Sequence, residues 1–178
     1  MNPWEQSETE LCCQAHEVFR TWAPSSTIVD AIRRSLSTST HPENLELFRS
    51  LPTEWRELTP AQAACTHPCT FLLNDELFAL FFPALATACL VPDTGGLFVD
   101  SFLGRLLPCP PQGKPTRITL PLHLFDLDQL RWIQAFLEHE SLVREPHETS
   151  LERRLLKAAA VIKEACDQRV TQDCRCFL

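Results

Sequence analysis

The chain has 178 residues, of which 44% are hydrophobic and 22% are charged, and its formal net charge at pH 7 is −7. These values are typical of a folded domain and exclude an intrinsically disordered chain. The acidic balance, without a basic stripe interleaved with aromatic residues, disfavours nucleic-acid binding. Fourteen prolines against four glycines favour short helices over a hairpin-rich β fold. We therefore expect an all-α protein with a single helical domain over residues 1–178. It should be a compact bundle of about six to seven short helices with a kinked central helix.

The nine cysteines do not predict a disulfide framework, because an odd number leaves at least one thiol unpaired. Residues 1–10 contain no basic segment followed by an apolar run, so the sequence predicts no secretory signal. We expect a cytoplasmic protein whose thiols stay reduced and pack as small, partly buried hydrophobic groups.

The first helix is expected to start around Ser7, because Ser7 and Glu10 have the spacing of a capping box. In such a box, each side chain accepts a hydrogen bond from the backbone N–H of the other residue. An apolar stripe with helical spacing follows, and Pro24 should end the helix. The stripe consists of Leu11, Ala15, Val18, Phe19 and Trp22.

Two short helices should follow, over 27–36 and 42–51, because apolar residues recur there at helical spacing. Pro42 is a good first helical residue, and Pro52 should stop the second of these helices. A brief helical turn is expected over 59–65, before Pro68 breaks the chain direction.

The central helix is expected to begin at Asn74, which has the side chain of an N-cap, with two carboxylates in the first turn. The apolar run over 77–91 is shorter than the roughly 20 residues that span a bilayer, so it predicts a buried core helix and no membrane span. Pro83 removes one backbone hydrogen bond and crowds the carbonyl group of Ala79, which predicts a kink.

The second half of the chain should contain three further helices. One is expected over 97–107, followed by an irregular proline-rich loop over 108–121. The next begins at Asp126, and the last begins with a capping box from Thr149 to Glu152, before a frayed tail over 171–178. The apolar residues predicted to face the core are Leu130, Ile133, Phe136, Leu137, Leu151, Leu155, Ala158, Ile162 and Cys166.

Two cysteine–histidine clusters could carry metal or thiol chemistry. Cys65, His67 and Cys69 are weak candidates for a zinc site, because a structural site needs four ligands and usually two spaced pairs. The one-residue spacer between Cys174 and Cys176 is too narrow for such a pair. Cys12 and His16 lie one turn apart, but Cys12 is on the apolar face, next to Ala15 and Phe19 in projection, and is interpreted as a packed thiol. We therefore predict no metal site and no cofactor.

Sequence motifs of common enzymes are incomplete in this chain. His16-Glu17 resembles half of a metalloprotease helix, but Arg20 stands where the second histidine would bind zinc. His139-Glu140 and His147-Glu148 lack the second histidine as well. No serine lies in a Gly-x-Ser-x-Gly turn, and no glycine-rich loop could hold a phosphate. The sequence therefore predicts no enzymatic activity.

The segment 71–85, FLLNDELFALFFPAL, resembles the motif of an uncharacterised bacterial domain family that typically reads F-L-T-P-E-A-F-R-Y-F-L-P-A. The likeness covers residues 11–142, with Trp55 upstream and a later helix similar to the family's F-x-x-L-x-x-x-Q helix. This chain departs from the motif at Asn74-Asp75, where the family has Thr-Pro, and at Phe81, where it has tyrosine. The family has no established activity, so the resemblance implies a compact helical fold and no specific function. The motif positions are Phe71, Asn74, Glu76, Phe78, Phe82, Pro83 and Gln129.

Three functions remain open. The preferred hypothesis is a non-enzymatic, protein-binding bacterial protein of the adaptor or immunity type, with another protein as its partner and neither nucleic acid nor membrane. The alternative is a metal- or thiol-dependent regulatory protein that uses the cysteine and histidine clusters. A hydrolase that uses Cys12 or Cys65 with a histidine is the least favoured. The sequence does not indicate an oligomeric state.

Overall fold

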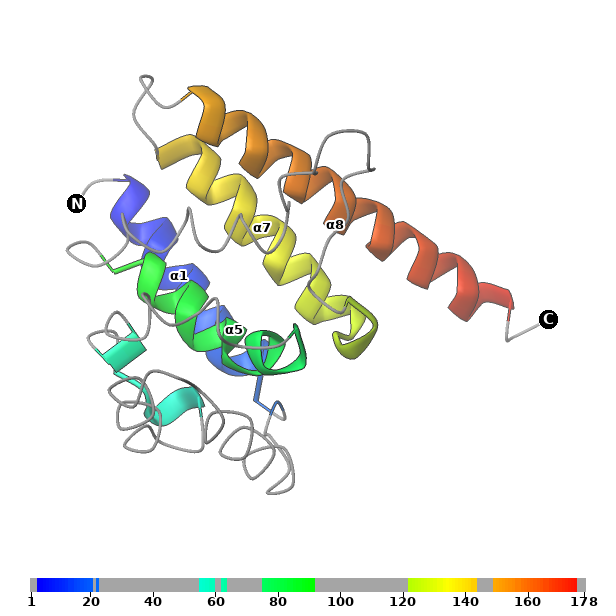
Figure 1. Cartoon of the computed structure of the whole chain (residues 1–178), viewed down its shortest axis with the longest axis horizontal. Coiled ribbons are helices and arrows are strands. Elements are labelled where there is room, and N and C mark those ends of the chain that lie inside the picture. The colour runs from blue at the N-terminus through cyan, green and yellow to red at the C-terminus, as the bar shows by residue number, and fades with distance from the viewer. Residues whose placement is uncertain are drawn as a thin grey trace, which may run out of the picture. The chain divides into compact units, whose positions relative to one another are not determined.

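The structure is a computed structural model that describes residues 3–20, 22, 55–59, 62–63, 75–91, 122–143 and 149–175. Within these residues the regular structure is helical and contains no strand, which confirms the all-α class (Figure 1). The helices are α1 (Pro3–Val18), α5 (Asp75–Cys89), α7 (Leu127–Val143) and α8 (Thr149–Arg175), with short 3₁₀ turns η1 (Trp55–Glu57) and η3 (Leu122–Leu124).

The chain divides into two compact units. The first contains residues 1–14 and 102–178, and the second contains residues 15–101. The division falls inside α1, so residues 3–14 of this helix belong to the first unit and residues 15–18 to the second. That the whole chain forms one domain stays a prediction.

Helix α1 begins earlier than the sequence predicted. Its first residue is Pro3, so Ser7 lies in the second turn and the proposed N-cap at Ser7 is wrong. Proline suits the first helical position because the backbone N–H that it lacks would have no partner within the helix there. The helix ends at Val18, and the N–H of Arg20 then bonds the carbonyl oxygen of Glu17 at 3.1 Å. Leu11, Ala15 and Phe19 are buried, as the stripe predicted.

The start of α7 agrees with the sequence. The N–H of Gln129 donates to Oδ1 of Asp126 at 2.8 Å, and the N–H of Asp126 donates to Oε1 of Gln129 at 3.0 Å. This reciprocal pair is a capping box. Phe125 and Leu130 are both buried, at the two positions of the hydrophobic staple that fixes the entry of the chain into a helix.

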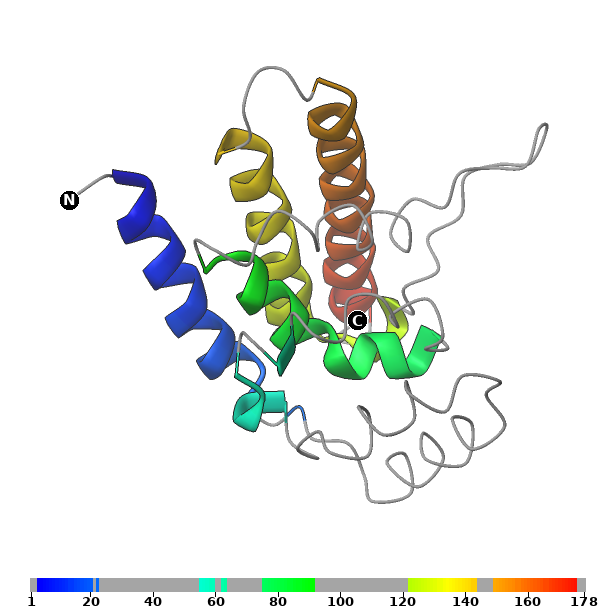
Figure 2. The same cartoon turned by 60° about the vertical axis from the view of Figure 1, so that its left-hand side comes forward.

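Helices α7 and α8 pack side by side and form the core of the first unit (Figures 1 and 2). The predicted apolar residues of both helices are buried, from Leu130 to Leu137 on α7 and from Leu151 to Cys166 on α8. With 27 residues against 17, α8 is longer by ten residues, about 15 Å. Because α8 extends to Arg175, residues 171–175 are helical, within the segment 171–178 for which the sequence predicted a frayed tail.

Helix α5 lies against η1 in the second unit. Its side chains from Phe78 onward are mostly buried, including Phe82, Pro83 and Leu85, which confirms a core helix. Among the described helices, none is both long and apolar enough to cross a membrane. The hydroxyl group of Thr87 donates to the carbonyl oxygen of Pro83 at 2.8 Å and lies 3.1 Å from that of Ala84.

The turn predicted over 59–65 is partly described. The N–H of Gln62 donates to Oγ1 of Thr59 at 3.2 Å, and the N–H of Thr59 donates to Oε1 of Gln62 at 2.9 Å. The N–H of Ala63 then makes a helical bond to the carbonyl oxygen of Thr59. The helices predicted over 27–36, 42–51 and 97–107 and the loop over 108–121 lie outside the described residues, so a total of six to seven helices stays a prediction.

Candidate functional site

The structure describes some of the candidate residues predicted from the sequence and leaves the others outside the described residues. Cys65, His67 and Cys69 lie outside the described residues, as do Phe71 and Asn74. Glu76 lies in the first turn of α5, whose later motif residues Phe78, Phe82 and Pro83 are core residues. Gln129 is buried as part of the α7 capping box. The described motif side chains therefore have packing and capping roles.

Cys12 has the character of a packed thiol. It is half-buried, and burial raises its pKa, with smaller contributions from Cys13 and the carboxylate of Glu8. A raised pKa keeps the thiol protonated at neutral pH, whereas a nucleophilic cysteine needs its thiolate. The ring of His16 instead stacks on Trp55, with 5.2 Å between ring centroids and 27° between ring planes. Cys12 therefore gives no support to a thiol hydrolase.

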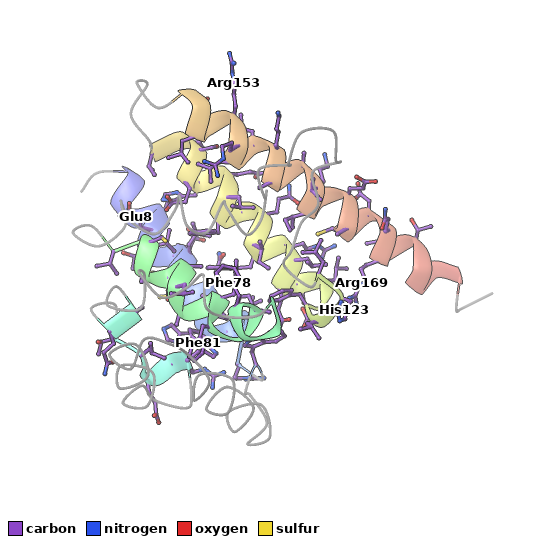
Figure 3. All side chains as sticks on the ribbon, in the orientation of Figure 1. Glu8, Phe78, Phe81, His123, Arg153 and Arg169 are labelled. Atoms are coloured by element: carbon purple, nitrogen blue, oxygen red, sulfur yellow. The ribbon has the colours of Figure 1, made fainter. Side chains whose placement is uncertain are left out.

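A polar cluster between α1 and α7 was not foreseen from the sequence. Its centre is His139 of α7, whose side chain is only 5% exposed. Oγ of Ser7 lies 3.4 Å from Nδ1 of His139, and Oε1 of Glu8 lies 3.9 Å from Nε2. Glu8 projects from α1, as Figure 3 shows. All three residues belong to the first unit.

The environment of His139 favours a neutral ring. Burial lowers its pKa, and the carboxylate of Glu8 opposes this effect more weakly. Nε2 is buried and has no hydrogen-bond partner. We assign the proton to Nε2, because that tautomer lets the Ser7 hydroxyl donate to Nδ1 and turns the N–H towards Glu8. The buried Trp132 of α7 makes a second hydrogen bond between the two helices. Its Nε1 donates to the carbonyl oxygen of Leu11 at 3.0 Å.

The cluster is better suited to holding two helices together than to catalysis. A hydroxyl, an imidazole and a carboxylate are the groups of a catalytic triad, but 3.9 Å between Nε2 and Glu8 is too long for the hydrogen bond that orients such an imidazole. An oxyanion site also needs free backbone N–H groups. From Ser7 onward, the N–H groups of α1 are used within the helix.

The position of His139 in the sequence contained a signal for its burial. It lies three residues after Phe136 and seven after Trp132, which places all three on one face of α7. A histidine on an apolar face, aligned with two aromatic residues, is a buried histidine that needs a polar partner from a neighbouring element.

Acid should weaken the first unit through His139. Because its folded pKa is lower than its unfolded pKa, the unfolded chain takes up a proton first as the pH falls below about 6.5. The contribution of neutral His139 to the free energy of unfolding is therefore fully present above the unfolded pKa. It is lost as the pH falls through the folded pKa. We expect urea unfolding to show a larger loss from about pH 7.5 to about pH 5.5 in the wild type than in His139→Gln. The control His123→Gln, at an exposed position, should lose as much stability over this pH range as the wild type. Equal losses in all three proteins would contradict the role assigned to His139.

The second unit contains an aromatic cluster around Trp55. Phe19 meets the Trp55 ring edge-on at 6.3 Å between centroids, and the guanidinium of Arg56 lies 5.5 Å from the Trp55 ring centroid. Nη2 of Arg56 donates to the carbonyl oxygen of Phe19 at 2.9 Å. Trp55 is 4% exposed, and its Nε1 has no hydrogen-bond partner. The cluster ties the end of α1 to η1 and leaves one buried donor unsatisfied.

Helix α8 presents a long exposed face in addition to its buried one. Five exposed residues recur at alternating spacings of four and three along this face, which we call the outer stripe: Leu156, Ala160, Lys163, Asp167 and Val170. Leu156 is 47% exposed and Val170 is 40% exposed.

After Glu152 in the first turn, the exposed charges among the described side chains of α8 are segregated along the helix. Basic residues come first, at Arg153, Lys157 and Lys163, and acidic residues follow at Glu164 and Asp167. Arg153 points away from the ribbon of α8 in Figure 3. Half-buried Arg169 is engaged differently, since its Nη2 donates to the carbonyl oxygen of His123 at 3.0 Å.

The described residues contain no group of three or more histidine, cysteine or acidic side chains that could hold a metal ion. Comparison with known proteins adds no relative: no family model, no curated protein and no solved structure matches the chain. The resemblance to the bacterial domain family therefore stays a prediction.

Proposed function

We propose that the protein is a non-enzymatic protein-binding domain of the adaptor or immunity type, of bacterial origin, and that α8 provides its binding surface. The observation that carries the proposal is the outer stripe. It places two large exposed apolar side chains, Leu156 and Val170, on the same face as Lys163 and Asp167. Interfaces between proteins combine apolar contacts with charged groups that select the partner.

Single exposed apolar residues are normal on protein surfaces and would carry no argument alone. The outer stripe differs because its residues follow a helical repeat over about four turns, with spacings that bring them to one face. The buried stripe of α8 already packs on α7, so the outer stripe is not needed for the core that α7 and α8 form. A helix that presents such a face can bind a groove or another helix.

Affinity capture with matched variants tests this proposal. The full-length protein would be used as bait in the native host, beside Arg153→Glu/Lys157→Glu and the control Arg20→Glu/Arg131→Glu. All four positions are exposed, and both double variants change the net charge by the same amount. We expect one partner to be recovered with the wild type and the control but lost with the α8 variant. Equal recovery with all three baits, or a tagged bait that recovers neither another protein nor the host's own untagged copy of the chain, would contradict the proposal.

The alternative of a metal- or thiol-dependent regulator gains no support from Cys12 or Cys166. Burial raises the pKa of both Cys12 and Cys166, which disfavours thiolate chemistry and metal binding at these positions. Its remaining candidates are Cys65, His67 and Cys69, outside the described residues. Metal analysis of the purified protein is the appropriate test.

We also propose that α5 bends at Pro83. Proline cannot donate the helical hydrogen bond, and its ring crowds the carbonyl group of Ala79. The bond from the Thr87 hydroxyl to the Pro83 carbonyl is of a kind that accompanies helix bending. The buried Phe82 and Leu85 would then be packed around a bend.

Replacing Pro83 by alanine tests the bend. Alanine gains about 3 kcal/mol of intrinsic helix propensity over proline. Straightening the helix should misplace Phe82 and Leu85 at a packing cost of about 1–3 kcal/mol. The loss of two buried ring methylenes adds about 0.8 kcal/mol each, so the total cost matches or exceeds the gain. We expect the melting temperature of Pro83→Ala to stay level or fall. A clear rise, with native helicity by circular dichroism, would show that the proline is only a tolerated defect.

A further inference from the structure

The outer stripe of α8 has an internal symmetry that restricts its partner. Lys163 is the middle residue of the stripe, and Leu156 and Val170 lie seven residues, about two turns, on either side of it. These are the two large hydrophobic residues that α8 exposes among its described side chains. Two copies of α8, placed antiparallel about a two-fold axis at Lys163, would bring Leu156 of each copy opposite Val170 of the other.

We propose that the partner of this stripe is a second copy of the same chain, bound antiparallel through α8. The proposal rests on the proposed function and names the occupant of its surface. A closed two-fold dimer uses the same patch on both subunits, so every contact occurs twice. The patch must then be complementary to itself, and the charges of α8 meet this requirement.

The charge order along α8 provides the complementarity. With the two-fold axis at Lys163, Glu164 and Asp167 of the second copy lie level with positions 162 and 159, between Lys157 and Lys163. A parallel arrangement would place like charges together. Only the antiparallel arrangement therefore pairs opposite charges and apolar residues at the same time.

The direction of helical side chains favours one specific pair. The Cα–Cβ bonds of an α-helix tilt towards its N-terminus. In the antiparallel arrangement, the side chain of Lys163 leans towards the level at which Asp167 of the second copy lies, about 6 Å along the axis. The two lysines at the centre lean away from each other, and each meets an aspartate. The interface therefore has two apolar pairs at its ends and two Lys163–Asp167 ion pairs between them.

Such an interface should be weak, reversible and sensitive to salt. A single helix from each subunit buries less surface than the roughly 1,600 Å² of a standard interface. Ion pairs at its rim are screened as the Debye length falls from about 10 Å at 0.1 M salt to about 3 Å at 1 M. We expect the apparent mass of the purified full-length protein to approach twice the chain mass at high protein concentration and low salt, and to return to that of one chain at high salt.

Charge exchange tests the proposed pair directly. Lys163→Asp creates two Asp–Asp pairs in the dimer, and Asp167→Lys creates two Lys–Lys pairs, so each variant alone should sediment as a monomer. An equimolar mixture should form a heterodimer, because one native Lys163–Asp167 pair is then kept and the two substituted positions form the second opposite-charge pair, with the charges exchanged. The controls Arg131→Asp and Asp128→Lys make the same charge changes at exposed positions of α7 and should dimerise like the wild type. Circular dichroism would confirm native helicity in every variant.

The possible outcomes separate this inference from the proposed function. A wild-type protein that stays monomeric at all concentrations overturns the dimer, and so do single variants that dimerise normally or a mixture that stays monomeric. These measurements use purified protein alone. Capture of a different partner through α8 by a monomeric wild type would leave the proposed function standing and remove only the second copy as its occupant.

Discussion

Replacing Phe136 by alanine is expected to lower the free energy of unfolding of the first unit by about 3–5 kcal/mol. The Phe136 side chain is 1% exposed and stacks on Trp132, with 5.6 Å between centroids and 6° between the ring planes. Alanine would remove most of its apolar surface, and the rigid helices around it can fill the resulting cavity only in part. Aromatic stacking with Trp132 would be lost as well.

Urea denaturation followed by circular dichroism and tryptophan fluorescence measures this loss. Leu142→Ala is the matched control, because Leu142 lies on the same helix and is 65% exposed. The control should change the stability by less than about 0.5 kcal/mol. A Phe136→Ala protein as stable as this control would mean that the α7–α8 hairpin is not packed as described. Separate transitions for the two units would contradict the prediction of a single domain.

Two substitutions of Trp55 should differ strongly from each other. Trp55→Ala should cost about 3–5 kcal/mol, because it removes the centre of the cluster that holds His16, Phe19 and Arg56. Trp55→Phe should cost much less. Phenylalanine keeps an aromatic ring and also removes the buried Nε1–H that has no partner, a group that costs about 1–3 kcal/mol when left unsatisfied.

Thermal and urea unfolding of both variants under the same conditions decide the point, with Trp132 as a remaining fluorescent reporter in the first unit. The expected order of stability is wild type near Trp55→Phe, and both well above Trp55→Ala. If Trp55→Phe were as damaging as Trp55→Ala, the indole N–H must have an acceptor in the folded protein, and the unsatisfied donor would be disproved.

The features that could be predicted from the sequence depend on local patterns. The α7 capping box needs only Asp126 and Gln129 at the right spacing, and the buried stripe of α8 needs only the helical repeat from Leu151 to Cys166. Both are confirmed. The predicted start of α1 was wrong because two local signals for a helix start compete there. The Ser7–Glu10 spacing is typical of a helix start, and Pro3 is equally suited to a first helical turn.

The polar cluster around His139 and the unsatisfied indole N–H of Trp55 could not be predicted from local patterns. Ser7 and His139 are 132 positions apart, and only the packing of α1 against α7 brings them together. The periodicity of α7 could have indicated that His139 is buried, but not which residue faces it. Likewise, the unsatisfied Nε1 of Trp55 is a property of the surrounding packing, which no spacing within the chain encodes.

Amine labelling of Lys163 gives the most direct test of the central claim that α8 is a protein-binding surface. The exposed Lys163 lies at the middle of the outer stripe. Its labelling rate would be compared in intact cells of the native host and in dilute purified protein, each normalised to the urea-unfolded chain. The account predicts labelling several-fold slower in cells, because a bound partner, whether a second copy or another protein, covers the stripe. Equal rates in cells and in dilute solution would show that nothing binds there and would contradict the account.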